Sequence, residues 1–356
     1  MRDAIRVLLV GTGQMGAGIA RLTLEKRGLE LVGAYGRRRE RAGTDLGRAI
    51  GLGRDLGIAL AADLGAEVGR SRPHVAIQTT CSRLADARTE IAILIRHGVH
   101  VLSIAEEMAY PAATSPAVAT ELHRLATEHR VAVLGTGVNP GFVLDLLVIA
   151  LTGVCADVRS IAATRVNDLS PYGPSVLAAQ GVGLTPEAFR TAREDGRVVG
   201  HVGFPQSLRM IADTVGWEIA RIEERREAIV SKVRRETPFV TVEPGHVAGC
   251  RHTAVAYRAG EPVITLIHPQ QVHPHLEGVE TGDTIEITGT PNVRLAGSPE
   301  IPGGLATIAL AVNMIPRVLS APPGLHSMAD LPVPAAILGD ARRLAHSGPR
   351  ESDSRG

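Results

Sequence analysis

Two adjacent carboxylates, Glu106 and Glu107, are the residues whose type and spacing suggest chemistry most directly. They follow an apolar run, residues 99–104, which is expected to form a buried strand of a parallel sheet. Reactive groups in such sheets gather at the carboxyl ends of the strands. Like charges side by side raise the pKa of one partner, as a general base working near neutrality requires. We expect an acid/base group here; the alternative is an acid pair favoured by a helix dipole.

A glycine-rich segment lies between the first apolar run, residues 5–10, and an amphipathic stretch. Its glycines Gly11, Gly13 and Gly16 match G-x-G-x-x-G, in which they permit a tight turn, the approach of a pyrophosphate and helix packing. The helix N-terminus offers N–H groups and its dipole to phosphates. We expect a dinucleotide site formed by the whole segment, which is Gly11, Thr12, Gly13, Gln14, Met15 and Gly16. The alternative is a structural turn that binds no phosphate.

The end of the second expected strand separates NAD from NADP sites. An NAD site usually carries Asp or Glu there for the ribose 2′-hydroxyl, but this chain has Arg37, Arg38 and Arg39. Arginines can pair with a 2′-phosphate, so NADP is preferred and NAD remains possible. The alternative is an arginine run on a solvated face. Thr79 and Thr80, at the end of another expected strand, are predicted to lie near the nicotinamide.

A histidine-rich segment invites interpretation as a metal site, since imidazole is the commonest metal ligand. It contains His268, His273 and His275, but no cysteine accompanies them and its prolines favour an edge strand or turn. We therefore expect no metal. A polar cleft or a contact between subunits is the preferred interpretation.

Positioning these residues requires a particular order of elements. Five apolar runs are predicted strands: 5–10, 29–35, 74–80, 99–104 and 131–135. They are interleaved with predicted helices, such as 85–97 and 117–128. This alternation is typical of a doubly wound parallel sheet. The sequence therefore predicts an α/β fold with a Rossmann NAD(P)-binding domain over residues 1–138.

The pattern changes after Gly135, where an α+β substrate and dimerisation domain is expected over residues 139–304. Its predicted helices are 142–151 and 205–219, and its predicted strands are 160–166, 247–257, 263–268 and 284–289. An apolar helical segment, about 305–335, is expected to return to the first domain. The polar tail, 346–356, is expected to be disordered.

Composition excludes several classes of protein. The 356 residues carry 38 Lys+Arg and 37 Asp+Glu, so a net charge of +1 gives no general attraction to nucleic acid or anionic membranes. Aromatic residues make up only 3%, which argues against base-stacking platforms. The three cysteines form no C-x-x-C pair, and neither a signal peptide nor a membrane span is apparent. We expect a soluble cytoplasmic protein with a small-molecule substrate.

Five segments together resemble the 2,4-diaminopentanoate dehydrogenases and the related native amine dehydrogenases. They are Ser103–Pro111 (SIAEEMAYP), Gly135–Asp145 (GTGVNPGFVLD), Asn167–Pro174 (NDLSPYGP), Gly200–Pro205 (GHVGFP) and Pro302–Pro316 (PGGLATIALAVNMIP). The resemblance covers nearly the whole chain outside the tail. It implies NAD(P)-dependent oxidative deamination of 2,4-diaminopentanoate to 2-amino-4-oxopentanoate and ammonia. It also implies a homodimer whose N-terminal half is similar to dihydrodipicolinate reductase.

The resemblance places the catalytic glutamate in the segment 103–111, so we take Glu106 first and Glu107 as the alternative. Residues after the last Rossmann strand or in loops of the second domain are expected to line the substrate pocket: Asn139, Phe142, Asn167, Tyr172 and His201. His201 is also a second candidate for proton transfer.

Other functions remain open alternatives. An amine dehydrogenase can work in the opposite direction, by reductive amination of simple ketones or aldehydes, and a dihydrodipicolinate-type reductase shares the expected fold. A catalytically inactive coenzyme-binding sensor belongs to a different class. The diamino acid is preferred because its extra charges need polar partners, and the second domain supplies several: Arg165, Asn167, Asp168, Tyr172, His201 and Arg251.

Overall fold

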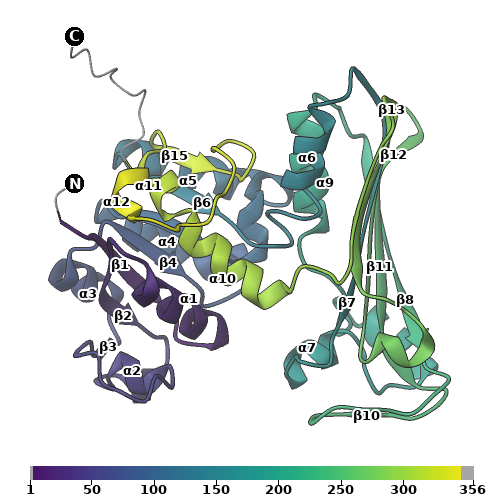
Figure 1. The fold of residues 1–356 in the computed structure, drawn as a ribbon, viewed down its shortest axis with the longest axis horizontal. Coiled ribbons are helices and arrows are strands. Elements are labelled where there is room, and N and C mark those ends of the chain that lie inside the picture. Colours follow the sequence, from purple (N-terminus) through teal and green to yellow (C-terminus); the bar gives the residue numbers. More distant parts are fainter. Residues whose placement is uncertain (1–2, 346–356) are drawn as a thin grey trace. The chain divides into compact units, whose positions relative to one another are not determined.

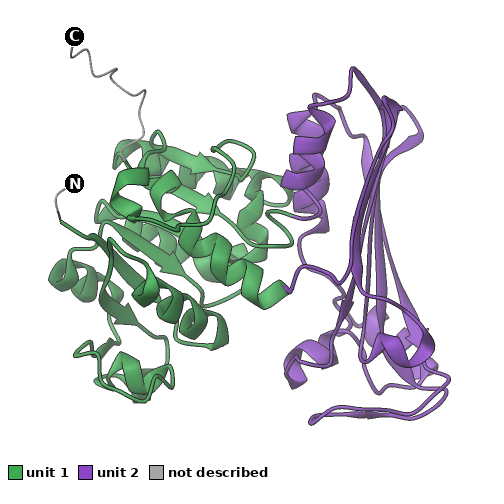
Figure 2. Cartoon of the chain, viewed as in Figure 1, with its two compact units in different colours: residues 1–142, 303–356 green, residues 143–302 purple. Residues whose placement is uncertain are grey.

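The computed structural model describes residues 3–345. The chain divides into two compact units, residues 1–142 with 303–356 (unit 1) and residues 143–302 (unit 2) (Figure 2). Unit 1 therefore contains the C-terminal segment that the sequence predicts to return to the first domain. The predicted disorder of residues 346–356 lies outside the described residues.

Unit 1 contains a seven-stranded sheet in the order β15-β6-β5-β4-β1-β2-β3 (Figure 1). Its strands are β1 (Ile5–Val10), β2 (Leu29–Tyr35), β3 (Leu60–Ala61), β4 (Val75–Gln78), β5 (His100–Ser103), β6 (Ala132–Gly135) and β15 (Gly324–His326). Every pairing is parallel, which confirms the predicted doubly wound sheet. All carboxyl ends consequently lie along one edge, called here the strand-end edge of unit 1.

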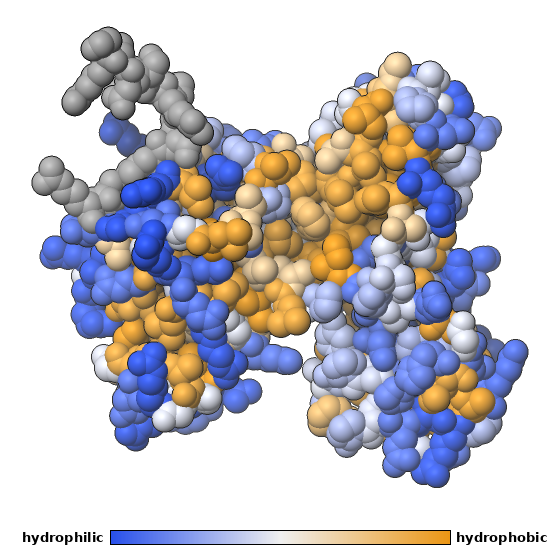
Figure 3. Space-filling view, in the orientation of Figure 1, coloured by the Kyte–Doolittle hydropathy of each residue, from blue (hydrophilic) through white to orange (hydrophobic). Residues whose placement is uncertain are grey.

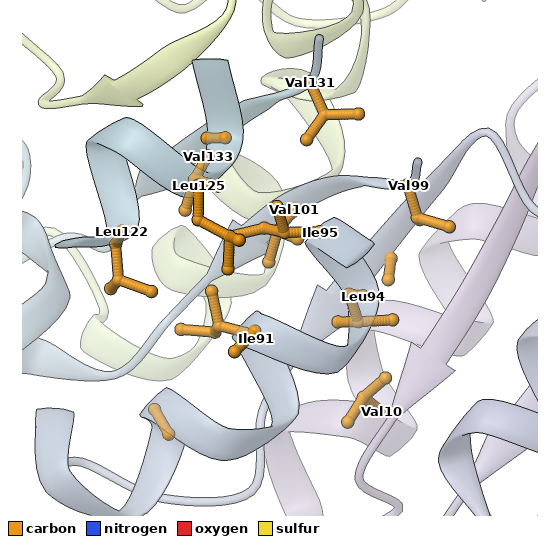
Figure 4. Close-up of a cluster of buried hydrophobic side chains, with 14 of the residues drawn as sticks. Val10, Ile91, Leu94, Ile95, Val99, Val101, Leu122, Leu125, Val131 and Val133 are labelled. Atoms are coloured by element: carbon orange, nitrogen blue, oxygen red, sulfur yellow. The ribbon is translucent and has the colours of Figure 1, made fainter. Parts of the chain in front are cut away.

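Helices cover both faces of this sheet. The longer ones are α1 (Gln14–Glu25), α3 (Leu64–Ser71), α4 (Leu84–Arg96), α5 (Pro116–Glu128), α10 (Gly303–Asn313) and α11 (Ile315–Leu319); α2 (Leu46–Ala49) and α12 (Ala341–Leu344) are short. Branched side chains of α4 and α5 pack on strand residues such as Val101 and Val133 to form a buried apolar core (Figure 4). On the other face, a Cβ at Gly18 of α1 would come 2.2 Å from Ile308 of α10, so the glycine permits close packing.

Unit 2 contains a six-stranded sheet in the order β14-β13-β7-β12-β11-β8. Its strands are β7 (Asp157–Asp168), β8 (Arg221–Val230), β11 (Val247–Arg258), β12 (Glu261–Gln271), β13 (Gly282–Thr290) and β14 (Val293–Gly297). Only β7 and β12 pair in parallel. The helices are α6 (Leu146–Thr152), α7 (Pro174–Ala179), α8 (Pro186–Glu194) and α9 (Phe204–Thr214), and β9 (Arg235–Glu236) pairs with β10 (Thr241–Val242).

The surface of unit 2 changes in character along its length. Figure 3 shows hydrophobic residues gathered over α6, whereas hydrophilic residues predominate over the β9–β10 hairpin. Within the described residues, no helix of the chain is long and apolar enough to cross a membrane.

The structure departs from the predicted elements in several places. The helix expected from residue 142 begins only at Leu146, after Asp145, whose carboxylate accepts a hydrogen bond from the Leu146 N–H. The predicted helical segment, about 305–335, is interrupted between Asn313 and Ile315 and ends at Leu319, and strand β15 follows within its predicted range. Strand β8 was not predicted, because its charged sequence RIEERREAIV lacks the apolar alternation by which a half-buried strand is recognised.

Candidate active site

The glycine-rich turn joins β1 to α1 at the strand-end edge. Gly11 has φ +106°, a left-handed conformation that favours glycine, and a Cβ there would come 2.5 Å from the Thr79 hydroxyl. A Cβ at Gly16 would lie 2.0 Å from the Gly11 carbonyl oxygen. Around Gly13, in contrast, nothing lies within 4 Å of the Cβ position. The backbone is therefore open to a phosphate just where the first-turn N–H groups of α1 need acceptors.

Arg37, the first residue of the arginine segment, is held against α4. Its Nε donates to the Glu90 carboxylate at 2.7 Å and its Nη2 donates to the Asp86 carbonyl at 2.7 Å. The hydrogen bond to Glu90, whose side chain is only 7% exposed, raises the pKa of Arg37. Two of the three guanidinium nitrogens of Arg37 thus already donate hydrogen bonds within the protein. Arg37 therefore fixes the arginine segment against α4.

Arg38 and Arg39 are exposed, and a further arginine lies beside the glycine-rich turn. The Arg41 guanidinium donates to the Thr12 hydroxyl at 3.4 Å and to the Ala49 carbonyl at 3.0 Å. The sequence analysis missed Arg41, because it considered only the three consecutive arginines. The signal was present as a fourth arginine one residue after Glu40, in a short 3-10 turn.

Thr79 and Thr80 lie at the end of β4, where their hydroxyls already have protein partners. The Thr79 hydroxyl donates to the Val10 carbonyl at 3.0 Å, which fixes the beginning of the glycine-rich turn. The Thr80 hydroxyl donates to Glu90 and accepts from the Gln78 side chain at 2.7 Å. These contacts give both residues a structural role, and contact with the nicotinamide stays a prediction.

Glu106 begins a 3-10 turn, residues 106–109, directly after β5. The turn approaches the end of β6 so closely that a Cβ at Gly135 would come 1.7 Å from the Met108 carbonyl oxygen. Burial raises the pKa of Glu106, and the nearby charge of Glu107 adds to this effect, while a hydrogen bond with Ser82 opposes it. The structure thus holds a carboxyl group of raised basicity at the strand-end edge.

Glu107 has a different environment, although it is the next residue. Its Oε2 accepts a hydrogen bond from the Leu84 N–H at 2.8 Å, at the start of α4. The N-cap residue of that helix, Arg83, provides no side-chain cap, so Glu107 supplies one from a distant part of the chain. The two glutamates therefore differ in environment: Glu107 caps α4, whereas burial raises the pKa of Glu106.

Asn139 and Phe142 follow β6 and are half-buried in unit 1. Their segment is fixed by the Thr136 N–H, which donates to the Ser103 carbonyl at 2.9 Å. It is also fixed by the Val138 N–H, which donates to the Thr307 hydroxyl of α10 at 3.1 Å. Both residues thus lie in the loop that follows the strand-end edge, as predicted.

In unit 2, the polar side chains gather on one face of the sheet. Alternate residues of β7 and β12 are buried, and this buried face is apolar at Ala163 and Leu266. Further along the same strands it becomes polar, at Arg165, Asn167, His268 and Gln270, and the neighbouring β11 adds His252. We call these five residues, with His201 from the loop before α9, the polar end of the unit 2 sheet.

The polar end contains three histidines in a defined arrangement. The His201 ring lies 5.0 Å from the His268 ring, and the His201 N–H donates to His252 Nδ1 at 3.0 Å. His252 Nε2 consequently carries the proton that is donated to Glu224 at 2.9 Å. His268 Nε2 donates to the Asn167 side-chain oxygen at 3.0 Å.

These contacts and burial decide the protonation of the cluster. Burial, with the neighbouring His252 and Arg165, lowers the pKa of His201 to about 3, and burial also lowers the pKa of His252 and His268. At neutral pH the three imidazoles are therefore uncharged hydrogen-bonding groups. His201 is thus poorly suited to the proton-transfer role considered for it.

Unpaired polar atoms remain at this end of the sheet. His201 Nε2 and Gln270 Nε2 are buried and have no hydrogen-bond partner among the described residues. Such atoms are costly unless a ligand or water satisfies them. The charge of Arg165 is already balanced by Asp283 at 2.7 Å. Asn167 and His201 thus lie in one cluster with Gln270, His252 and His268, and the contact of Asn167 and His201 with a substrate stays a prediction.

Tyr172 lies elsewhere in unit 2. It packs against an apolar cluster that includes Leu169, Leu177 and Val272. Burial raises the pKa of its hydroxyl, so it stays protonated in the neutral range. Its surroundings indicate a packing role, and contact with a substrate stays a prediction.

The fold and these groups define a class of protein. A parallel sheet whose first strand-to-helix turn carries G-x-G-x-x-G at the strand-end edge is typical of dinucleotide-dependent oxidoreductases. The particular family follows from residues 142–347, which match the 2,4-diaminopentanoate dehydrogenase C-terminal domain, and the chain belongs to this family. Residues 5–103 match the N-terminus of dihydrodipicolinate reductase. The predicted family and the class of an amine-acting oxidoreductase are thus confirmed.

Relatives of known name cover nearly the whole chain. A 2,4-diaminopentanoate dehydrogenase from Acetoanaerobium sticklandii is 44% identical over 96% of this chain and 97% of its own. An amine dehydrogenase from Streptomyces virginiae is 25% identical over 94% of this chain and 98% of its own. The structure of an amine dehydrogenase from Mycobacterium smegmatis has a TM-score of 0.82 at 27% identity, covering 94% of this chain and 98% of that one.

Proposed function

We propose that this protein oxidises 2,4-diaminopentanoate at its 4-amino group, with a nicotinamide coenzyme as hydride acceptor, to give 2-amino-4-oxopentanoate and ammonia. The observation that carries the proposal is Glu106, a carboxyl group of raised pKa on the sheet edge that also carries the glycine-rich turn. The 44% identity with a relative named for this activity supports the choice of substrate.

Glu106 performs the proton transfers. An alkylammonium has a pKa near about 10 by analogy with lysine, and it cannot release a hydride until it loses a proton. The Glu106 carboxylate attracts the ammonium and accepts this proton, after which hydride transfer from the substrate carbon leaves an iminium. Water adds to the iminium carbon and loses one proton to solvent, which leaves a carbinolamine. Glu106 returns its proton to the carbinolamine nitrogen, and ammonia leaves as the hydroxyl proton is released and the ketone forms. Such acid/base assistance contributes roughly 10²–10⁴-fold.

The polar end of the unit 2 sheet recognises the diamino acid. A carboxylate needs hydrogen-bond donors, and the unpartnered Gln270 Nε2 supplies one. The buried, neutral His201 supplies a second polar contact through Nε2. An analogue that lacks the polar groups of the diamino acid leaves Gln270 Nε2 and His201 Nε2 without hydrogen bonds. The site should therefore bind such an analogue poorly.

NADP is the preferred coenzyme in this proposal. Arg38 and Arg39 are exposed on the segment after β2, and Arg41 lies at the glycine-rich turn through Thr12. No carboxylate precedes them at the end of β2, where an NAD site usually holds one for the ribose. Arg37 positions this segment through Glu90.

We further propose a homodimer formed through the outer face of the unit 2 sheet. Helices α8 and α9 pack on one face of this sheet, and the outer face is the opposite one. The centre of the outer face carries half-buried apolar residues, including Ala162, Val255 and Ile267. An arginine at Ile267 should convert a dimer to a monomer in light scattering after size exclusion. Retention of the dimer by Ile267→Arg would assign the interface to another surface.

A cytoplasmic location completes the proposal. Cys81, Cys155 and Cys250 are all free thiols. Free cysteines are typical of proteins from reducing compartments.

Product analysis tests the activity. The purified protein, NADP and 2,4-diaminopentanoate should yield NADPH, ammonia and 2-amino-4-oxopentanoate in equal amounts, the last identified by mass spectrometry. Reduction of the coenzyme without release of ammonia would indicate that the protein oxidises an alcohol or another group instead of an amine. Absence of turnover with bound coenzyme would favour the sensor.

A further inference from the structure

A second cluster of ligand-type side chains lies beyond the polar end of the unit 2 sheet. Asp168 ends β7, while His273 and His275 belong to the turn after β12. One ligand atom from each of the three lies within 4.8 Å of the others. This set differs from the three histidines of the sequence segment, because His268 points to Asn167 instead.

His273 is held from several sides. Its N–H donates to Asp168 Oδ1 at 3.0 Å and to the Ser170 hydroxyl at 2.8 Å, and its carbonyl accepts from Arg235 at 3.3 Å. Its backbone has φ 44°, a left-handed conformation that is unfavourable for a residue other than glycine. Strained residues of this kind persist when the surroundings over-determine them, and they cluster at ligand sites.

A separate contact of the ring sets the tautomer of His273. Its ring Nε2 lies 2.7 Å from the Glu236 carbonyl oxygen, which can only accept, so Nε2 carries the proton and Nδ1 keeps its lone pair. A ring nitrogen that donates to a backbone carbonyl is the arrangement that orients metal-ligating histidines. Ser170 and the His273 N–H both donate to Asp168 Oδ1, which leaves Oδ2 available for a metal ion.

We propose that Asp168, His273 and His275 bind a divalent metal ion of the zinc class, which ties the end of β7 to the turn after β12. Imidazole and carboxylate ligands suit such ions, and three protein ligands with one water complete a four-coordinate site. In a tetrahedral site with bonds near about 2.0–2.2 Å, ligand atoms lie roughly 3.4 Å apart. The His275 side chain is exposed and its ring lies 5.6 Å from the His273 ring, so a rotation of this side chain brings the ligand atoms to the required distance.

Equilibrium dialysis of the full chain against Zn²⁺, followed by elemental analysis, tests the site. The wild type should bind one equivalent that is lost in His275→Ala, whose exposed side chain can be removed without unfolding the protein. Asp168→Asn keeps an oxygen for the Ser170 and His273 hydrogen bonds but removes the charge, and it should also weaken binding. The affinity should fall by more than the roughly 10–100-fold that loss of an outer-shell partner costs.

His129→Ala, at an exposed histidine of unit 1, is the matched control and should bind Zn²⁺ like the wild type. Zn²⁺ should also slow hydrogen exchange in residues 272–278 of the wild type but not of His275→Ala. The proposal is overturned if the wild type binds no stoichiometric Zn²⁺ at micromolar concentration. It is equally overturned if His275→Ala retains the ion or its protection.

Discussion

The strand-end edge of unit 1 and the polar end of the unit 2 sheet carry polar residues in different ways. In unit 1 the chemical groups lie in turns after parallel strands, and one of them, Glu106, has a raised pKa. In unit 2 most of them lie on the strands themselves, and the three histidines of the polar end have lowered pKa values. Burial shifts both kinds of group towards their neutral forms, but only the carboxyl gains basicity. In the proposed function, proton transfer falls to unit 1 and substrate recognition by uncharged groups to unit 2.

The largest effect is expected from Glu106→Gln. Glutamine keeps the size of the side chain but cannot accept a proton, so turnover should fall by roughly a hundredfold or more. Glu107→Gln should instead lower stability by about 1 kcal/mol, because the hydrogen bond to the Leu84 N–H loses its charge. Steady-state kinetics and denaturant unfolding of the two variants separate these roles.

Coenzyme affinity, measured by fluorescence quenching, is the control for both glutamate variants and should be unchanged. Turnover near that of the wild type in Glu106→Gln would move the acid/base role to another group. A large loss of turnover in Glu107→Gln at unchanged stability would assign that role to Glu107.

The second effect concerns the coenzyme. Removing Arg38, Arg39 and Arg41 together should raise the KM for NADP about tenfold or more, as expected for lost charge-assisted hydrogen bonds, and leave the KM for NAD nearly unchanged. Arg37→Ala is the comparison, since its bonds to Glu90 and Asp86 are internal, and it should affect both coenzymes similarly. Equal losses for both coenzymes in the triple variant would contradict the preference for NADP.

The third and smallest effect concerns stability at acidic pH, which should depend on the lowered pKa of His201. The pKa of His201 is about 3 in the folded protein and near 6.5 in an unfolded chain. The unfolded state therefore binds a proton that the folded state does not, and the contribution of His201 to stability is present above pH 6.5 and lost as the pH falls towards 3. Between pH 7 and 5.5 this loss is about 1 kcal/mol.

Urea unfolding at these two pH values, for the wild type and His201→Asn, measures that loss. The variant should decline less steeply with acid, while His129→Ala, at an exposed site, should follow the wild type. Parallel declines for all three proteins would show that His201 is not buried in its neutral form.

The sequence predicted part of the fold and of the candidate site, and it missed the rest for physical reasons. Strand β2 was placed at Leu29–Tyr35, the bounds found, because strands buried in a parallel sheet are continuous apolar runs. Strand β8 carries many charged residues without apolar alternation and was missed. In the candidate site, Glu106 and Glu107 could not be separated, since only folding brings the start of α4 to one of them.

The histidine cluster shows a second limit of sequence patterns. His201, His252 and His268 come from three elements far apart in the chain, and their contacts depend on strand pairing that no local motif encodes. The pairing of His252 with His268 follows from the register of β11 and β12. His268 was predicted at the end of the strand 263–268, but its partner Asn167 lies on a different strand.

The most direct test of the account compares two substrates. We expect kcat/KM with NADP to be at least roughly a hundredfold higher for 2,4-diaminopentanoate than for 2-aminopentane, because the simple amine leaves the polar atoms of unit 2 unsatisfied. The measurement is the initial rate of NADPH formation over a range of each amine. Comparable kcat/KM for the two amines would contradict the account, since the polar end of the unit 2 sheet would then not recognise the diamino acid.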